Sequence, residues 1–228
     1  MPYKKSDKTE LKKDEKRKLI FKTAAKVFAE KGYHQTSVKD ITDRAEVSVG
    51  TFYLYFRNKE DLFEKLYDEM EQIINNIKNY AMQKKVNNAA ERFANVIAAS
   101  VWTYETFREL SKIMLIEAVG LNPRFEKKYA DIMVKSCAGM EATLKDLKDK
   151  GIIDVPDTKV AAIGCEGAFN HAIIYWLRTE EKADLKLYTY PMVVFSLQAL
   201  KINFSQGIIK ASIDEIFQDL DKRKNEFI

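Results

Sequence analysis

Residues 36–61 read TSVKDITDRAEVSVGTFYLYFRNKED. This stretch predicts two short helices joined by a tight turn and followed by the capped start of a longer third helix. Thr36 or Ser37 begins the first helix, because a short hydroxyl side chain accepts a backbone N–H that has no partner inside the helix. Asp40 stands where the acid of a capping box reaches back, and Ser48 repeats the start signal for the second helix.

The second of these helices has an inner and an outer face. Phe52 and Phe56 are four residues apart, so they share one side and predict a buried face. The outer face is left with small residues at its start and phenols further along: Val49, Gly50, Thr51, Tyr53, Leu54 and Tyr55. This combination suits the major groove of DNA, because small residues let the helix approach base edges and tyrosine hydroxyls reach backbone oxygens. A helical hairpin whose tyrosines only cover neighbouring apolar surface is the alternative.

Positive charge is concentrated locally rather than spread over the chain. The net charge is +4 on 228 residues, so contacts to nucleic acid must come from local basic placement. An N-terminal arm has such an excess, since Lys4, Lys5, Lys8, Lys12, Lys13, Lys16, Arg17 and Lys18 outnumber Asp7, Glu10, Asp14 and Glu15. The arm is expected either to hold phosphates beside the helical hairpin or to remain a solvated tail. Asn58 caps the third helix, and Lys59 in its first turn gains nothing from the helix dipole but gains from a phosphate.

The rest of the chain has the period of helices and predicts an all-α fold. The hydrophobic fraction of 46% is enough for a real core, and only four prolines and eight glycines interrupt the pattern. One helix is expected through Ile20 and Phe28 and ends at Gly32, and a long one runs from Asn58 to about Met82. Further helices are predicted at residues 89–104, 105–119, 125–150, 157–179, 185–201 and 208–224. We found no convincing strand pattern and no internal repeat.

Cysteine usage and hydropathy predict a cytoplasmic protein that is not in a membrane. Cys137 and Cys165 lie among apolar residues in helix-like stretches, which is typical of buried, inert thiols in a reducing compartment. No hydrophobic signal segment follows Met1, and no apolar run approaches the roughly 20 residues of a membrane span.

In the order of these helices and in the sequence of the helical hairpin, the chain resembles the TetR family of bacterial transcriptional regulators. The resemblance is densest over residues 20–66, where AAKVFAEKGYHQTSVKDITDRAEVSVGTFYLYFRNKEDLF follows the family's DNA-binding pattern almost position by position. It implies an N-terminal three-helix, helix-turn-helix DNA-binding domain with its arm at residues 1–57. A helical effector-binding and dimerisation domain would then occupy residues 58–228. Both domains would belong to a homodimeric repressor of an operator on double-stranded DNA.

The resemblance also assigns roles to single residues of the DNA-binding domain. Phosphates would be bound by Thr36 and Ser37 at the start of one helix, bases by Ser48, Val49, Gly50 and Thr51, and the DNA backbone on either side by Tyr53, Tyr55 and Lys59. Two positions depart from common family patterns, since Val49 stands where a basic residue is frequent and Tyr55 where histidine is frequent. Base readout would therefore lean on apolar contact with a thymine methyl group.

Two helices near the C-terminus are expected to form the dimer interface. Small residues on the first permit close approach of another helix, and the second adds larger apolar residues; the set is Ala161, Gly164, Gly167, Ala168, Tyr190, Val193, Val194, Leu197 and Leu200. Together they would form a symmetric four-helix contact. The alternative is that the small residues pack inside one subunit. The extension after Asn203 would enlarge this contact or cap the bundle.

An apolar effector pocket is expected from bulky and polar residues that are unusual for a plain core. The candidates are Trp102, Phe107, Met114, Glu117, Met133, Phe169, Asn170, His171 and Tyr175. Residues 117–133 and 167–177 look like the corresponding segments of TetR-type regulators of fatty-acid metabolism, which bind long-chain acyl-CoA. That resemblance implies an acyl-CoA effector, with Lys127 and Lys128 near its phosphates. A multidrug-type or other apolar effector is the alternative.

Two other classes of function were weighed. An all-α enzyme needs converging catalytic or metal-binding groups, but the chain has only two histidines, and Cys165, Glu166 and His171 lack the spacing of a helical metal site. We therefore predict no catalytic residue, no metal and no cofactor. A helical adaptor that binds only protein would leave Tyr53 and Tyr55 without a role in DNA binding.

Overall fold

The protein is described by a computed structural model that covers residues 7–179 and 184–227. Over these residues the chain forms helices, turns and loops and contains no β-strand, so the all-α prediction is confirmed. The chain divides into two compact units. The first comprises Met1–Met70 with Glu109–Glu117, and the second comprises Glu71–Arg108 with Ala118–Ile228. Lys4 and Lys5 of the predicted arm lie outside the described residues.

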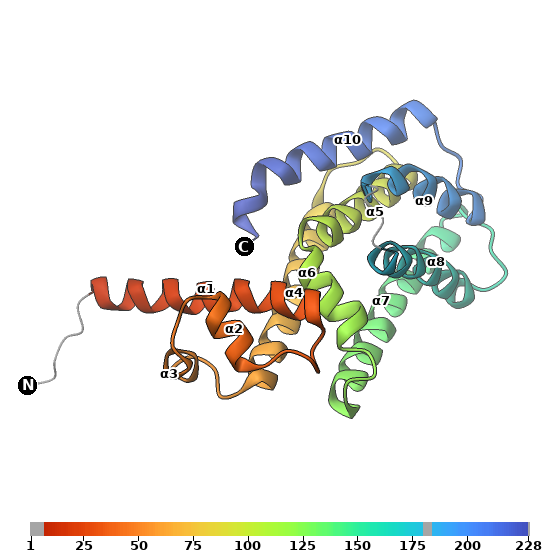
Figure 1. Ribbon diagram of the computed structural model, residues 1–228. Coiled ribbons are helices and arrows are strands. Elements are labelled where there is room, and N and C mark those ends of the chain that lie inside the picture. Colours follow the sequence, from red (N-terminus) through yellow and green to blue (C-terminus); the bar gives the residue numbers. More distant parts are fainter. Residues whose placement is uncertain (1–6, 180–183, 228) are drawn as a thin grey trace, which may run out of the picture. The chain divides into compact units, whose positions relative to one another are not determined.

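The first unit contains the predicted helical hairpin (Figure 1). Its elements are α1 (Asp7–Lys31), α2 (Val38–Arg44), α3 (Val49–Tyr53), the first part of α4 (Lys59–Gln83), most of α6 (Arg108–Lys112) and η1 (Ile113–Glu117), a π-helical turn. The first helix is longer than the sequence indicated, because it begins at Asp7 and includes much of the segment expected to be an arm.

Helix ends in the first unit follow the capping signals of the sequence. Ser37 and Asp40 form the predicted capping box of α2, and the Ser48 side chain accepts the backbone N–H of Thr51 at the start of α3. Asn58 Oδ1 accepts the Asp61 N–H at 2.8 Å, which caps α4. Gly32 ends α1 at a φ of 79°, a left-handed conformation that favours glycine.

A turn of four residues, 45–48, connects α2 to α3. Ala45 closes α2, Glu46 follows at a φ of 54°, and the Val47 N–H donates to the Thr42 carbonyl at 3.0 Å. One left-handed residue directly after a helix is the usual way to satisfy its last carbonyls while changing direction. The turn therefore fixes the angle between the two short helices.

Aromatic packing holds the first unit together and explains where it ends. Phe28 of α1 meets the Phe63 ring edge-on at 5.1 Å, and Tyr33 meets the same ring at 4.8 Å. Leu62, Phe63 and Leu66 of α4 are fully buried. Because these first turns of α4 complete the core of the hairpin, the first compact unit extends into α4 as far as Met70, and a domain boundary at residues 57 and 58 stays a prediction.

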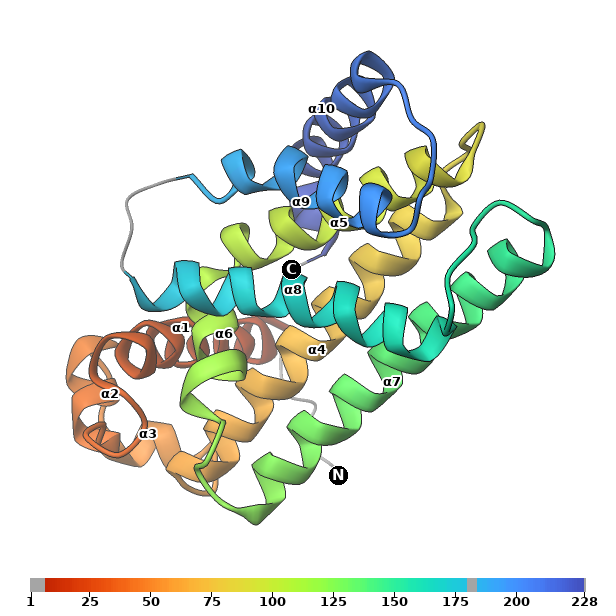
Figure 2. The same ribbon diagram turned by 90° about the vertical axis from the view of Figure 1, so that its right-hand side faces the viewer.

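The second unit contains α5 (Ala89–Thr106), α7 (Pro123–Asp149), α8 (Thr158–Arg178), α9 (Lys186–Ala199), α10 (Gln206–Arg223) and η2 (Lys224–Glu226). Figure 2 shows α9 and α10 beside α5, and α7 beside α8, as their contacts also require. These bounds lie within a few residues of the helices predicted from the sequence, except that the segment 105–119 is split between the end of α5, α6 and η1.

The C-terminal extension caps this bundle. Ile209, Ile213, Ile216 and Leu220 form the buried stripe of α10. Acidic residues of α10 add specific ties, since Asp221 Oδ1 accepts the indole N–H of Trp102 at 2.6 Å and Asp219 pairs with Lys84 at 2.5 Å. Tyr80 also donates its hydroxyl to Asp219. Of the two roles considered for residues after Asn203, the structure supports capping of the subunit's own helices.

A pair of carboxyl groups joins the end of α5 to the start of α9. Glu105 Oε1 accepts the Leu185 N–H at 2.9 Å, and the Glu105 carboxyl shares a hydrogen bond with Asp184. Partial burial, together with the bond to Asp184, raises the pKa of Glu105 to about 7. The same bond lowers the pKa of Asp184. Glu105 is therefore the proton donor of the pair near neutral pH.

We expect Glu105→Gln to remove a pH dependence of stability. A carboxyl whose pKa is raised by folding favours the folded state below its unfolded pKa of 4.5, and that contribution is lost as the pH rises through about 7. Glutamine keeps a donor for Asp184 and an acceptor for Leu185 without ionising. Urea unfolding from pH 5 to 8 should show the wild type losing more stability than the variant. Parallel curves for the two proteins would contradict the shared proton.

Candidate nucleic-acid interface

The outer face of α3 is exposed and mostly apolar. Tyr53 is 55% exposed, Leu54 72% and Val49 43%, and Gly50 is exposed beside them. The helix is held from beneath by Phe52 and Phe56, whose ring centroids are 5.5 Å apart and whose side chains are almost fully buried. Exposed apolar and phenolic side chains on a short, firmly seated helix are typical of a recognition surface.

Gly50 is not required by the packing of the fold. A Cβ atom at this position would meet only Ser48 Oγ, at 3.7 Å, which is an ordinary van der Waals distance. The backbone conformation is helical, so alanine would also be acceptable there. The missing side chain therefore leaves space on the outside of the unit, where another molecule can approach the backbone closely.

The hydroxyl groups at the start of α3 are partly engaged with each other. Ser48 Oγ accepts the Thr51 N–H at 3.1 Å and lies 2.9 Å from Thr51 Oγ1. Ser48 is exposed and Thr51 half-buried, so both hydroxyls keep hydrogen-bonding capacity on the outer side. Tyr55 is half-buried, with its ring 6.5 Å from that of Phe56, so Tyr53 is the more accessible of the two phenols.

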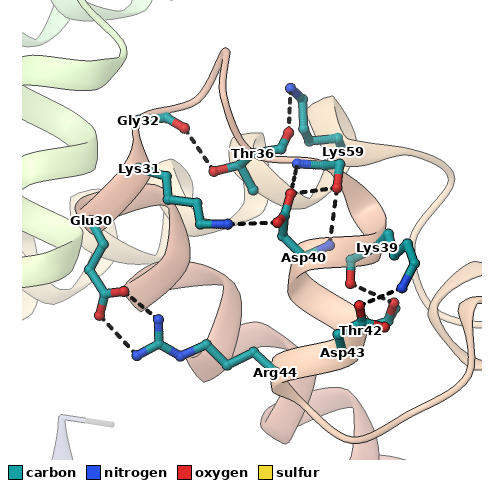
Figure 3. A network of polar contacts seen from close by, with 11 residues as sticks. Glu30, Lys31, Gly32, Thr36, Lys39, Asp40, Thr42, Asp43, Arg44 and Lys59 are labelled. Atoms are coloured by element: carbon teal, nitrogen blue, oxygen red, sulfur yellow. Dashed lines mark hydrogen bonds and ion pairs between the residues drawn. The ribbon is translucent and has the colours of Figure 1, made fainter.

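Thr36 and Ser37 both have hydrogen-bond partners inside the first unit. Thr36 is buried, and its hydroxyl donates to the Gly32 carbonyl at 2.7 Å, so the side chain closes the loop between α1 and α2 and does not face outward (Figure 3). Ser37 is exposed, but its Oγ donates to Asp40 Oδ2 and accepts the Asp40 N–H at 3.0 Å. Both hydroxyls are therefore used within the unit, and the phosphate contacts expected of these two residues stay predictions.

Lys59 also has an internal role that the sequence did not indicate. Its Nζ donates to the carbonyls of Tyr33 and Thr36, each at 2.8 Å, and lies 4.1 Å from the centre of the Tyr33 ring. Burial lowers the pKa of Lys59. Its ammonium group therefore fastens the loop between α1 and α2, and the phosphate contact expected of Lys59 stays a prediction.

Ion pairs between α1 and α2 were missed by the sequence reasoning. Arg44 Nη2 lies 3.0 Å from Glu30 Oε1, and Lys31 Nζ lies 2.6 Å from Asp40 Oδ1 (Figure 3). The hydrogen bond from Lys31, followed by that from Ser37, lowers the pKa of Asp40 well below its ordinary value. Neither pair has the spacing of neighbours on one helix, so no local pattern could have revealed them.

The predicted effector residues are distributed over both units. Trp102 is buried against Phe107 and bonded to Asp221, whereas Met114 and Glu117 belong to the first unit. Glu117 Oε2 accepts the Tyr33 N–H at 3.1 Å, so this carboxylate supports the loop between α1 and α2.

The other members of that set are divided between the surface and one groove. Met133, His171 and Tyr175 are exposed, Asn170 is half-buried, and Phe169 packs near Tyr104. Their grouping around one effector stays a prediction. A groove of about 600 Å³ lies between α8 and α9 and is lined by Ala168, Phe169, Leu187, Tyr188, Pro191, Met192, Phe195 and Ser196. Only Phe169 of the predicted effector residues contributes to it.

The predicted dimer residues divide into an exposed and a buried set. On α8, Gly164, Gly167 and Ala168 are exposed and Ala161 is half-buried, beside the exposed apolar side chains of Val160 and Ile163.

On α9, the expected face was wrong in part. Val193, Leu197 and Leu200 are buried inside the subunit, while Tyr190 and Val194 are half-buried. The exposed apolar face of α9 is instead formed by Leu187, Pro191 and Phe195. This helix has apolar residues on all sides, so the sequence did not distinguish the inner from the outer face.

Comparison with known proteins adds independent evidence. Residues 20–66 match a family model described as bacterial regulatory proteins, tetR family. The fatty acid metabolism regulator protein of Bacillus subtilis is 29% identical over 168 residues, which span 73% of this chain and 86% of that protein.

Two solved structures share the fold. FadR from Bacillus subtilis, in complex with stearoyl-CoA, has a TM-score of 0.66 at 26% identity and covers 79% of this chain and 97% of its own. The fatty acid degradation regulator FadR from Bacillus halodurans has a TM-score of 0.69 at 24% identity, covering 88% and 100%. These relatives are regulators and not enzymes.

Gly50→Ala tests whether the exposed face of α3 touches DNA. Stability should stay the same or rise by up to about 1 kcal/mol, because alanine favours a helix and the added Cβ fits. Affinity for a bound duplex should fall about tenfold or more, ~1.4 kcal/mol, because the methyl group blocks close approach. Fluorescence anisotropy and urea unfolding would measure the two effects.

Gly139→Ala is the matched control, since Gly139 is an exposed glycine of α7 with nothing within 4 Å of the added Cβ. The control should keep full DNA affinity. Equal affinity of Gly50→Ala and wild type would remove α3 from the interface.

Proposed function

We propose that this chain, which belongs to the tetR family of bacterial regulatory proteins, represses transcription from an operator and releases it when a long-chain acyl-CoA binds. The observation that carries the proposal is the outer face of α3, which lies inside the segment that matches the family model. Tyr53 is exposed on this face, and the packing of the fold does not require a glycine at Gly50. Repression in the cytoplasm is the mode of action that we assign to it.

Recognition of DNA would combine apolar and hydrogen-bonding contacts from α3. Val49 offers methyl groups to a thymine, and Gly50 lets the backbone approach the base edges. Tyr53, more than half exposed, has the reach for a backbone phosphate. In a two-fold dimer the two copies of α3 would enter successive major grooves about 34–36 Å apart.

The exposed apolar face of α8 and α9 would bind a second copy of the chain. Val160, Ile163 and Tyr175 on α8 and Leu187 and Phe195 on α9 are at least half exposed. The glycines Gly164 and Gly167 between them have nothing within 4 Å of an added Cβ, so a partner helix can come close. A symmetric contact of the two helices with their copies would bury these side chains.

The acyl-CoA proposal rests on the relative that was solved with stearoyl-CoA. In this chain, the second unit would hold the acyl chain among the apolar side chains within its helices, because the groove of about 600 Å³ between α8 and α9 belongs to the face proposed for the partner subunit. Lys127 and Lys128, in the first turns of α7, are the cations that we assign to the CoA phosphates.

Two continuous pieces of chain would carry the signal between the units. α4 has residues in both, and α6 with η1 connects α5 of the second unit to the Glu117 carboxylate that binds the Tyr33 N–H in the first. An effector that prefers one arrangement of the second unit can therefore bias the loop before α2. It can change operator affinity only by its differential affinity for the two states.

The effector proposal predicts that stearoyl-CoA weakens operator binding by about 5- to 150-fold, a coupling of about 1–3 kcal/mol. Anisotropy titrations at fixed salt would measure operator affinity with stearoyl-CoA, with free CoA and with stearate. Release by stearoyl-CoA alone supports the proposal. If stearoyl-CoA saturates the protein in calorimetry while operator affinity stays constant, the coupling is refuted.

The dimer proposal predicts that Ile163→Asp gives monomers. A carboxylate placed in an apolar contact between subunits would lose its hydration without gaining a partner. Native mass spectrometry and anisotropy should show dissociation together with weakened operator binding. Val134→Asp on α7 is the control, because Val134 is 70% exposed and lies outside the proposed face. A dimeric Ile163→Asp protein would count against the α8–α9 contact.

A further inference from the structure

The N-terminal half of α1 extends beyond the body of the first unit. Ile20 is the first buried side chain of α1, and every side chain from residue 13 to residue 19 is exposed. Figure 1 shows this half of the helix reaching past α2, at the end of the unit where α3 lies. A helical segment without packing is marginal by itself in water, so an overhang of this kind calls for a partner.

In the overhang, residues 13–19, the helix face that is apolar and buried further along α1 carries basic side chains instead. Ile20, Ala24 and Val27 lie on one face and are buried. Lys13, Lys16 and Arg17 precede Ile20 by seven, four and three residues, so they occupy the same face one and two turns earlier. This face is apolar where the unit covers it and basic where the unit ends.

The cations of the overhang are only partly neutralised. Asp14 pairs with Lys18 at 3.2 Å and with Arg17 at 3.5 Å. Within the part of the chain whose side chains are described, no ion pair joins Lys13 or Lys16 to a carboxylate. An exposed helix face with an excess of positive charge favours a polyanion and repels a second copy of itself.

We propose that the overhanging half of α1, residues 13–19, is a second DNA contact that binds phosphates of the duplex beside the pairs read by α3. The inference rests on the proposed function, because α3 brings the duplex to this end of the unit. Lysines act there as point charges, so the contact adds affinity and reach without sequence preference. Leu19 is exposed at the end of this segment, directly before Ile20, the first buried residue of α1.

The double variant Lys13→Gln/Lys16→Gln tests the contact. Glutamine keeps a high helix propensity, and both positions are exposed, so folding should be unchanged. Each lost phosphate contact flattens the plot of log affinity against log salt by about 0.9. One or two contacts on each of two subunits therefore predict a slope smaller in magnitude by about 2 to 4.

The matched control is Lys135→Gln/Lys145→Gln on α7, which removes the same charge from exposed positions in the second unit. This control should keep the wild-type slope, and an equal loss in both variants would overturn the proposal, because net charge alone would then explain it. Asp14→Asn should act in the opposite sense, since it frees Arg17 and Lys18 and should tighten binding. Unchanged or weaker binding of Asp14→Asn would speak against the contact.

Binding measured on duplexes of different length would show where on the DNA α1 makes its contact. On an operator trimmed to the base pairs read by α3, wild type should bind with the slope of the lysine double variant, and on a longer duplex the two should separate. Identical slopes on the long duplex would refute the role of α1 while leaving the proposed function intact. Absence of salt-dependent duplex binding by wild type would refute the proposed function itself.

Discussion

The structure depends on the burial of Phe52 and Phe56 beneath a helix of five residues. A helix this short has no stability of its own, because forming the first turn costs more conformational entropy than its few hydrogen bonds return. It persists because the two rings are almost fully buried in contact with each other, and because Ser48 satisfies a backbone N–H at its start. The exposed side chains of α3 are therefore held in place by their buried neighbours.

Local signals made much of the first unit predictable. Ser37, Ser48 and Asn58 act as helix caps, and Gly32 ends α1, because each effect depends on residues within one turn. The side chains of Thr36 and Lys59 could not be assigned in the same way. Their partners are the carbonyls of a loop whose path is set by tertiary packing, so residue types that suit a phosphate were used inside the protein.

In the second unit, the sequence predicted the positions of the helices but not which of their faces are buried. Its helices were located well, but helix faces were not, since α9 carries apolar residues all round and gives no polar side from which to orient it. Val193 and Leu197 are internal, whereas Leu187 and Phe195 face outward. The residues predicted to line an effector pocket lie in both units. Bulky and polar residues were taken as a set, although Glu117 and Trp102 have separate partners in different units.

The π-helical turn η1 determines which way the residues after it point. A π-turn holds one residue more than an α-turn, and such turns are tolerated mostly where they place a useful side chain. Removing a single codon from the segment 113–117 would restore a regular helix and rotate every later residue by about 100°. The Glu117 carboxylate would then swing away from the Tyr33 amide. The extra residue of η1 therefore sets the direction of the carboxylate that supports the loop ahead of α2.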